Sequence, residues 1–233
     1  WLGDGTGAFS FHSAVPDGVM GPTSASAPVA RDVNLDGNMD VIGFASDGVR
    51  VLLGDGTGVF PDAVDFDLEI VGGTQLLTVG KLDGNVGVDI AVVGDDFETL
   101  TIILNDGSGV FEITSSINVG PYPRALTSGD FNADGFDDLA VIAGGDVSVV
   151  FGDAAGTFDT TGTIPVMGGP VRDINAADFN GDGFADLAIA DQTYLASSIR
   201  LFCGTNAGQF VSEGEFAAGV GPAFMTNADL GND

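Results

Sequence analysis

The chain has 233 residues, of which 44% are hydrophobic and 37 are glycine, a composition that excludes a disordered acidic tail and predicts many short strands joined by tight turns. Its 34 acidic residues against 6 basic residues give a net charge of −28, which excludes nucleic acid and anionic membranes as expected partners. The single cysteine excludes an intrachain disulfide, and no apolar run approaches the roughly 18 residues of a membrane span, so no membrane insertion is expected.

The first element along the chain is a glycine hairpin of the pattern Gly-x-x-x-Gly-x-Phe, at residues 3–9. The pattern recurs at 54–60, 152–158 and 204–210, and a copy at 105–111 has Asn105 in place of the first glycine. The phenylalanines at positions 9, 60, 111, 158 and 210 lie 51, 51, 47 and 52 residues apart. Glycine turns between apolar runs predict β-hairpins, and their even spacing predicts a structural repeat.

The second recurring element is an acidic loop of the pattern Asp-x-Asn-x-Asp-Gly-x-x-Asp. Complete copies occupy residues 32–40, 130–138 and 178–186, a degenerate copy occupies 81–89, and a truncated copy runs from Asp229 to Asp233. Their first positions lie 49, 49, 48 and 51 residues apart. Because two independent patterns share one period, the chain is predicted to be a repeat protein with a unit of about 49 residues.

Each period contains apolar or alternating runs for four short strands, as at 125–128, 139–143, 147–151 and from 157 onward in the third unit. A four-stranded antiparallel unit repeated at this spacing predicts an all-β fold, a β-propeller. We expect one propeller domain divided into a partial blade at 1–20, blades at about 21–71, 72–120, 121–168 and 169–219, and a partial blade at 220–233. Since both ends fall inside a blade, we expect a fragment of a longer propeller, with a five-bladed ring lacking part of one blade as the alternative.

The complete acidic loops have the composition of a calcium site. Oxygen-bearing side chains stand at positions 1, 3, 5 and 9, and the glycine at position 6 permits the positive φ that wraps the loop around a centre. Ca²⁺ prefers such an oxygen-only set, whereas Mg²⁺ prefers a smaller shell rich in water. Three carboxylates ~4.5 Å apart repel by about 4 kcal/mol per pair at an effective dielectric near 20, and a divalent ion reverses that sign. The alternative is an acidic turn without metal.

We therefore predict about three calcium sites, with a backbone carbonyl as the ligand at position 7. The predicted ligands are Asp32, Asn34, Asp36, Asn38 and Asp40, then Asp130, Asn132, Asp134, Phe136 and Asp138, and then Asp178, Asn180, Asp182, Phe184 and Asp186. The degenerate loop 81–89 is predicted to be metal-free, because Lys81 replaces the first aspartate and β-branched Val86 resists positive φ. Its ammonium is expected to neutralise Asp83 and Asp89. The half-loop at 229–233 contributes to a site only if its second half exists.

The paired motifs resemble a known repeat. Segments such as 178–189, followed by hairpins of the type at 53–58, resemble FG-GAP repeats of the VCBS type, and the resemblance covers essentially the whole chain. Such repeats form the blades of integrin alpha subunits and occur in many bacterial surface proteins and fungal lectins. The resemblance implies a propeller, usually of seven blades, with calcium in the loop between the first two strands of a blade. It does not identify the binding partner, because one fold hosts many functions.

Catalysis finds little support in the sequence, and we expect that the chain is not an enzyme. His12 is the only histidine and lies in a strand-like segment, so it is predicted to be structural. Apolar neighbours predict that Cys203 is a buried thiol and not a nucleophile. No phosphate-binding glycine loop or zinc-ligand cluster is present.

Three functions remain open: an extracellular or cell-surface adhesion and interaction module, a carbohydrate-binding propeller, and a non-catalytic accessory domain of a larger secreted enzyme. A protein or glycan partner is expected at one propeller face, near the segments that join consecutive blades. Candidate ligand-binding residues there are Tyr122, Arg124 and Arg172, and the two arginines each lie six residues before the first aspartate of a loop. The alternative is that these arginines neutralise nearby acids. Tyr122 and Tyr194 could stack on a sugar, but aromatic residues do not repeat from blade to blade, which disfavours a multivalent lectin.

Overall fold

The structure is a computed structural model that describes residues 2–3, 9–10, 26–45, 48–68, 75–94, 98–166, 171–192, 197–205, 208–219 and 225–226. Its strands are β1 (Leu2–Gly3), β2 (Phe9–Ser10), β3 (Val29–Arg31), β4 (Asp40–Phe44), β5 (Gly48–Leu53), β6 (Asp62–Asp67), β7 (Gln75–Gly80), β8 (Asp89–Gly94), β9 (Thr99–Asn105), β10 (Phe111–Asn118), β11 (Ala125–Gly129), β12 (Asp138–Ala143), β13 (Asp146–Phe151), β14 (Asp159–Pro165), β15 (Val171–Ala177), β16 (Asp186–Gln192), β17 (Ser197–Gly204) and β18 (Phe210–Gly219). The described residues contain no helix, and so none with the length and apolar character of a membrane span.

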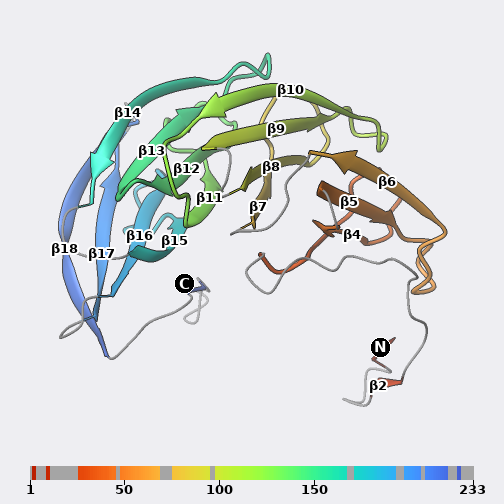
Figure 1. The fold of residues 1–233 in the computed structure, drawn as a ribbon, viewed down its shortest axis with the longest axis horizontal. Coiled ribbons are helices and arrows are strands. Elements are labelled where there is room, and N and C mark those ends of the chain that lie inside the picture. Colours follow the sequence, from red (N-terminus) through yellow and green to blue (C-terminus); the bar gives the residue numbers. More distant parts are fainter. Residues whose placement is uncertain are drawn as a thin grey trace.

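Sixteen of these strands form four antiparallel sheets: the first sheet (β3–β6), the second (β7–β10), the third (β11–β14) and the fourth (β15–β18). Within each sheet the strands are neighbours in chain order, as in a meander. The sheets are arranged in an arc, with the first strand of each sheet inside and the fourth strand on the outer rim (Figure 1). The prediction of an all-β fold built from four-stranded antiparallel units is therefore confirmed. Four such sheets are seen in the part of the chain that the structure describes, so a count of seven blades stays a prediction.

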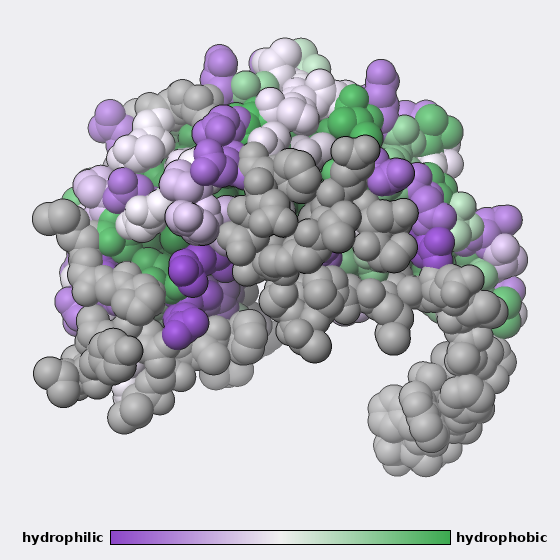
Figure 2. All heavy atoms as spheres, in the orientation of Figure 1, coloured by the Kyte–Doolittle hydropathy of each residue, from purple (hydrophilic) through white to green (hydrophobic). Residues whose placement is uncertain are grey.

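The hydrophobic core is divided among the spaces between consecutive sheets. One buried cluster joins the first and second sheets, another the second and third, and another the third and fourth. The second and third sheets have a neighbouring sheet on both faces, and every residue of their second strands, β8 and β12, is buried. Hydrophilic residues among those described are scattered over the face seen in Figure 2, both at the outer rim and toward the inside of the arc, and are not gathered in one patch. The sheets therefore depend on their neighbours for burial, as in other repeat proteins.

A short pair, β1 with β2, precedes the first sheet, with Leu2 opposite Ser10 and Gly3 opposite Phe9. This pairing encloses the first glycine hairpin of the sequence, whose turn residues lie outside the described part of the chain. The equivalent hairpins each join the third and fourth strands of a sheet.

Candidate metal centres

The acidic loops and the glycine hairpins lie at one end of the sheets. Each acidic loop joins the first and second strands of its sheet, and each hairpin joins the third and fourth. In an antiparallel meander these two connections share an end, and the other two connections share the opposite end. Acidic loops also contact the hairpins of neighbouring sheets at this end. The amide of Gly84, in the acidic loop of the second sheet, donates to the carbonyl of Ala154, in the hairpin of the third sheet, at 3.1 Å.

The three complete loops share one set of hydrogen bonds. In loop 130–138, the carboxylate of Asp130 accepts the amides of Asp134 at 3.1 Å and Gly135 at 2.9 Å. The Asn132 side-chain oxygen accepts the Asp134 amide, and the Asp134 carboxylate accepts the Phe136 amide, both at 2.9 Å. The loops 32–40 and 178–186 repeat all four bonds. Since the donors are amides of positions 5 to 7, the oxygens of positions 1, 3 and 5 are drawn to the concave side of each loop.

The backbone of these loops is left-handed at two positions. Position 6 is glycine, with φ of 87° at Gly37, 91° at Gly135 and 90° at Gly183. Position 4 is also left-handed, including φ of 58° at Leu35 and 60° at Ala133, where a side chain makes this conformation cost about 1 kcal/mol or more. No residue of the degenerate loop 81–89 has a positive φ. The complete loops thus share a backbone conformation that the degenerate loop lacks.

The aspartate at position 9 has a role that the sequence analysis missed. Asp138 is fully buried, and its carboxylate accepts the amide of Phe131, at position 2, at 2.9 Å and the amide of Gly152, the first residue of the hairpin, at 3.0 Å. Asp40 and Asp186 make the same two bonds in their sheets, and so does Asp89 in the degenerate loop. This side chain therefore ties the two repeated motifs together. The sequence contained a signal for this, because the degenerate copy keeps its last aspartate after losing its first.

The electrostatic environment differs along the loop. Burial raises the pKa of Asp138 to about 7 and that of Asp89 to about 6, against the opposing effect of their amide donors. At the exposed positions the pKa of the carboxylate is lowered instead. A hydrogen bond from the Asn38 amide lowers the pKa of Asp36, and one from the Gly183 amide lowers the pKa of Asp178, so both carboxylates are ionised at neutral pH.

The donor set of positions 1, 3 and 5, with the carbonyl of position 7, consists only of oxygen and fits a hard cation such as Ca²⁺. The position-9 carboxylate is engaged by two amides, and among the described residues no three carboxylate, imidazole or thiol groups are grouped as a metal site. Hydrogen bonds thus bring positions 1, 3 and 5 of each loop together, and position 9 in addition links the loop to the hairpin. The calcium-ligand role of these residues stays a prediction.

Lys81 does not contact the acids of its own loop. Its ammonium lies 4.7 Å from the centre of the Phe136 ring and 3.4 Å from the Gly135 carbonyl oxygen, both in the acidic loop of the next sheet. Its backbone amide donates to the Asp137 carboxylate at 2.8 Å, and the Asp137 amide returns a bond to the Lys81 carbonyl. The expectation that this ammonium neutralises Asp83 and Asp89 is therefore wrong, because the lysine reaches across to the neighbouring sheet.

The predicted ligand-binding residues lie at the end opposite the acidic loops. Tyr122 is 69% exposed, with φ of 54°, in the segment between β10 and β11. Arg124 immediately precedes β11, and Arg172 is the second residue of β15. Both arginines are exposed, and Arg172 takes part in an interaction within the chain. His12, Tyr194 and the half-loop at 229–233 lie outside the described residues.

Comparison with protein families identifies an FG-GAP-like repeat at residues 81–141 and again at 130–189, and an FG-GAP repeat at 171–209. Together these matches span residues 81–209, more than half of the chain, and they include the degenerate loop and two complete loops. A comparison with curated protein sequences found no match.

Solved structures of similar fold include two with TM-scores above 0.5. One is an Agrocybe aegerita lectin described as recognising non-reducing terminal N-acetylglucosamine, with a TM-score of 0.58, 21% identity, and coverage of 81% of this chain and 50% of the lectin. The other is BBS1N in complex with ARL6DN, with a TM-score of 0.55, 12% identity, and coverage of 83% of this chain and 57% of that chain. This chain therefore spans about half the length of these structures, and the likeness concerns the fold alone.

Proposed function

We propose that this chain, which belongs to the FG-GAP repeat family, is a calcium-binding interaction module that works outside the cell or at the cell surface. The four sheets described are four blades of a larger propeller, for which we propose seven blades. This chain covers only about half of each of the two similar solved structures, which supports a propeller with more blades than the four described. Calcium in the acidic loops stiffens one end of the blades, and the segments at the other end are available to a protein or glycan partner.

One observation carries the calcium proposal. Three loops with the same acidic pattern share four hydrogen bonds and left-handed residues at positions 4 and 6, whereas the loop that lost its first aspartate has no positive φ. A carboxylate at position 1 that binds the amides of positions 5 and 6 holds the loop in a curved form with oxygens inside. In that form the like charges of positions 1 and 5 are close together, and a divalent cation removes the repulsion. The proposed ligands are the oxygens of positions 1, 3, 5, 7 and 9, since a carboxylate that accepts two amides keeps lone pairs for a cation.

Calcium titration of chelator-treated protein by calorimetry tests this proposal. We expect about three sites in the wild type, one fewer in Asp134→Ala, and an unchanged number in Asp83→Ala, which removes an acid of the degenerate loop and serves as the matched control. Calcium should also raise the melting temperature by several degrees, because a ligand at 100 times its Kd stabilises the folded state by about 2.7 kcal/mol. Identical melting curves in calcium and in chelator would contradict the proposal.

A binding role is favoured over a catalytic one by the state of the single thiol. Cys203 is buried, at 8% exposure, and burial raises its pKa, so little reactive thiolate is present at neutral pH. We propose that the chain has no catalytic activity of its own.

Carbohydrate binding is the second candidate function. The similarity in fold to the Agrocybe aegerita lectin favours it, as does the exposed Tyr122, which is held with positive φ at the end away from the acidic loops. An aromatic ring presented in this way can stack on a sugar face. Screening on a glycan array separates the two functions: reproducible sugar binding that is lost in Tyr122→Ala supports the lectin, and its absence leaves the protein-interaction module.

A further inference from the structure

The ammonium of Lys81 lies against the acidic loop of the next sheet. It is 4.7 Å from the centre of the Phe136 ring and 3.4 Å from the Gly135 carbonyl oxygen. The carbonyl of Phe136 is the proposed ligand at position 7, so the positive charge stands beside a residue that would hold the ion. Among the described residues no carboxylate forms an ion pair with this ammonium, and its charge is therefore not neutralised by direct contact.

Backbone contacts fix Lys81 in this place. Its amide donates to the Asp137 carboxylate at 2.8 Å, and its carbonyl accepts the Asp137 amide at 2.7 Å. The residue before it is Gly80, where a β-carbon would lie 2.6 Å from an oxygen of the Asp137 carboxylate, so this approach requires glycine. Since both backbone groups of Lys81 are bound to position 8 of loop 130–138, its side chain starts next to that loop.

Loop 178–186 has the same ligand pattern but a different neighbour. Its residues at positions 1, 3, 5, 7 and 9 are of the same types as those of loop 130–138. The residue of the preceding loop that meets it is Asp130, whose carbonyl accepts the amide of Ala185, at position 8, at 3.4 Å. Asp130 thus has the place beside loop 178–186 that Lys81 has beside loop 130–138. The same repeat position supplies a cation to one loop and an anion to the other.

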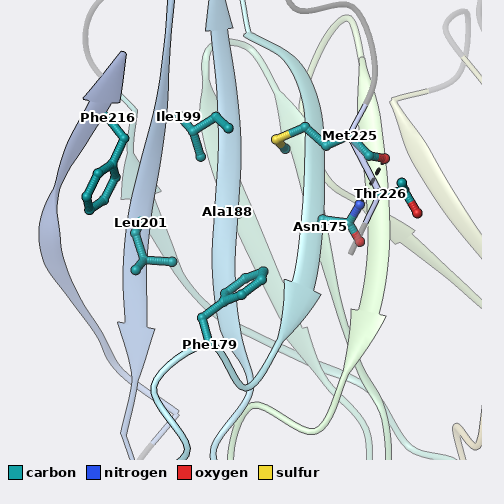
Figure 3. A pocket seen from close by; sticks show the side chains of 8 residues that line it. All are labelled: Asn175, Phe179, Ala188, Ile199, Leu201, Phe216, Met225 and Thr226. Carbon is teal, nitrogen blue, oxygen red and sulfur yellow. Dashed lines mark hydrogen bonds between the residues drawn. The ribbon is translucent and has the colours of Figure 1, made fainter. Parts of the chain in front are cut away.

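The other side of loop 178–186 borders an apolar hollow of about 500 Å³ on the fourth sheet. Figure 3 shows the ring of Phe179, from this loop, at one end of the hollow, which Ala188 of β16 and Leu201 of β17 also line. None of the described residues that line the hollow is charged. Neither the preceding loop nor the hollow therefore brings a described basic side chain to this loop, which makes it the reference for loop 130–138.

We infer, on the basis of the proposed calcium-binding function, that Lys81 lowers the calcium affinity of loop 130–138 from the neighbouring sheet and has little effect on loop 178–186. The ammonium acts through its charge and not as a ligand. A single and a double positive charge about 10 Å apart in water at low salt repel enough to change an affinity about three-fold. Salt removes this effect, because the Debye length falls from about 30 Å at 0.01 M to about 3 Å at 1 M. The degenerate loop 81–89 thus weakens calcium binding in its neighbour.

Calorimetric calcium titration of chains that keep one complete acidic loop tests the role of Lys81. Asp32→Ala with Asp182→Ala leaves loop 130–138 intact, and Asp32→Ala with Asp134→Ala leaves loop 178–186 intact. Each chain is titrated with the lysine unchanged and with the substitutions below, at ~0.01 M and at ~1 M salt. Circular dichroism in chelator establishes that each variant is folded.

Lys81→Met should raise the calcium affinity of loop 130–138 about three-fold at ~0.01 M salt, and the rise should disappear at ~1 M salt. Loop 178–186 should change by less than about 1.5-fold, because its distance from Lys81 is greater. Lys81→Arg keeps the charge and should keep the affinity. The matched control is Arg31→Met, which also removes an exposed positive charge, beside the first acidic loop, and should leave loop 130–138 unchanged.

A second variant places the cation beside the other loop. In the chain that keeps loop 178–186, Asp130→Lys should lower the calcium affinity about three-fold relative to Asp130→Met at ~0.01 M salt. Both substitutions remove the carboxylate, so the comparison isolates the ammonium. Equal affinities of these two variants overturn the inference, also where Lys81→Met does not fold.

An equal or lower calcium affinity of loop 130–138 in Lys81→Met overturns the inference. A rise that persists at ~1 M salt also overturns it, because the side chain then acts through the shape of the loop and not through charge. A rise of the same size in loop 178–186 or in Arg31→Met assigns the effect to the net charge of the chain, with the same consequence. Absence of calcium binding in both chains contradicts the proposed function itself, and the role of Lys81 with it.

Discussion

Phe131→Ala is expected to lower the free energy of unfolding by about 4 kcal/mol, whereas Phe179→Ala should lower it by less than about 2 kcal/mol. The two residues occupy position 2 of complete acidic loops, and the amide of each donates to the aspartate at position 9 at 2.9 Å. Alanine keeps that bond, so the comparison isolates the side chain. Phe131 is fully buried and meets Phe210 edge-on at 5.4 Å between ring centres, whereas Phe179 is 42% exposed. A buried phenylalanine costs about 3–5 kcal/mol on truncation, and an edge-on ring pair adds about 0.5–1.5 kcal/mol.

The assay is urea unfolding in calcium-saturated buffer, followed by circular dichroism, with amide exchange in β12 and β16 to locate the change. Phe131→Ala should accelerate exchange on both sides of the interface between the third and fourth sheets. Phe179→Ala should leave the third sheet unaffected. Equal losses of stability in the two variants would refute the claim that burial by the following sheet, and not local sequence, sets the energetic value of this position.

Three further predictions follow from particular side chains. In chelator, burial holds the pKa of Asp89 in the folded state above its unfolded value. The stability contributed by protonated Asp89 is therefore fully present below about pH 4 and is lost as the pH rises through about 6, a change of up to about 3 kcal/mol in the free energy of unfolding. Urea unfolding between pH 4.5 and 6.5 should show this decline, reduced in Asp89→Asn; identical slopes would contradict it. Lys81→Met should lower stability by about 0.5–1 kcal/mol in thermal unfolding through loss of the ammonium over Phe136, and Lys81→Arg should retain it. Asn105→Gly should destabilise by about 2 kcal/mol although glycine is the residue of the other hairpins, because the buried side chain donates to the carbonyls of Val33 and Val88. Equal or higher urea stability of that variant would show that these bonds are dispensable.

Much of the fold was predictable because its signals are local. The glycines of the loops mark residues that require positive φ, such as Gly135, and the apolar runs between them mark buried strands such as β12. The acidic pattern likewise predicted which oxygens line the loop at positions 1, 3 and 5, since their hydrogen bonds span only two to five residues. Position 9 was predicted only as a ligand, because one of its hydrogen-bond partners lies in the hairpin. For Asp138 this partner is the amide of Gly152, 14 residues further along the chain.

The sequence by itself determined the period, the four strands of each unit and the curved acidic loops, because each depends on backbone preferences and on contacts within a few residues. The tertiary structure alone decided the partners that lie in another sheet. Lys81 reaches Gly135, 54 residues away, and Asn105 reaches Val33, 72 residues away. It also decided that Phe131 is buried while Phe179 is exposed, although their loops are nearly identical. The physical reason is that burial depends on whether another sheet packs against the face, which no local pattern specifies.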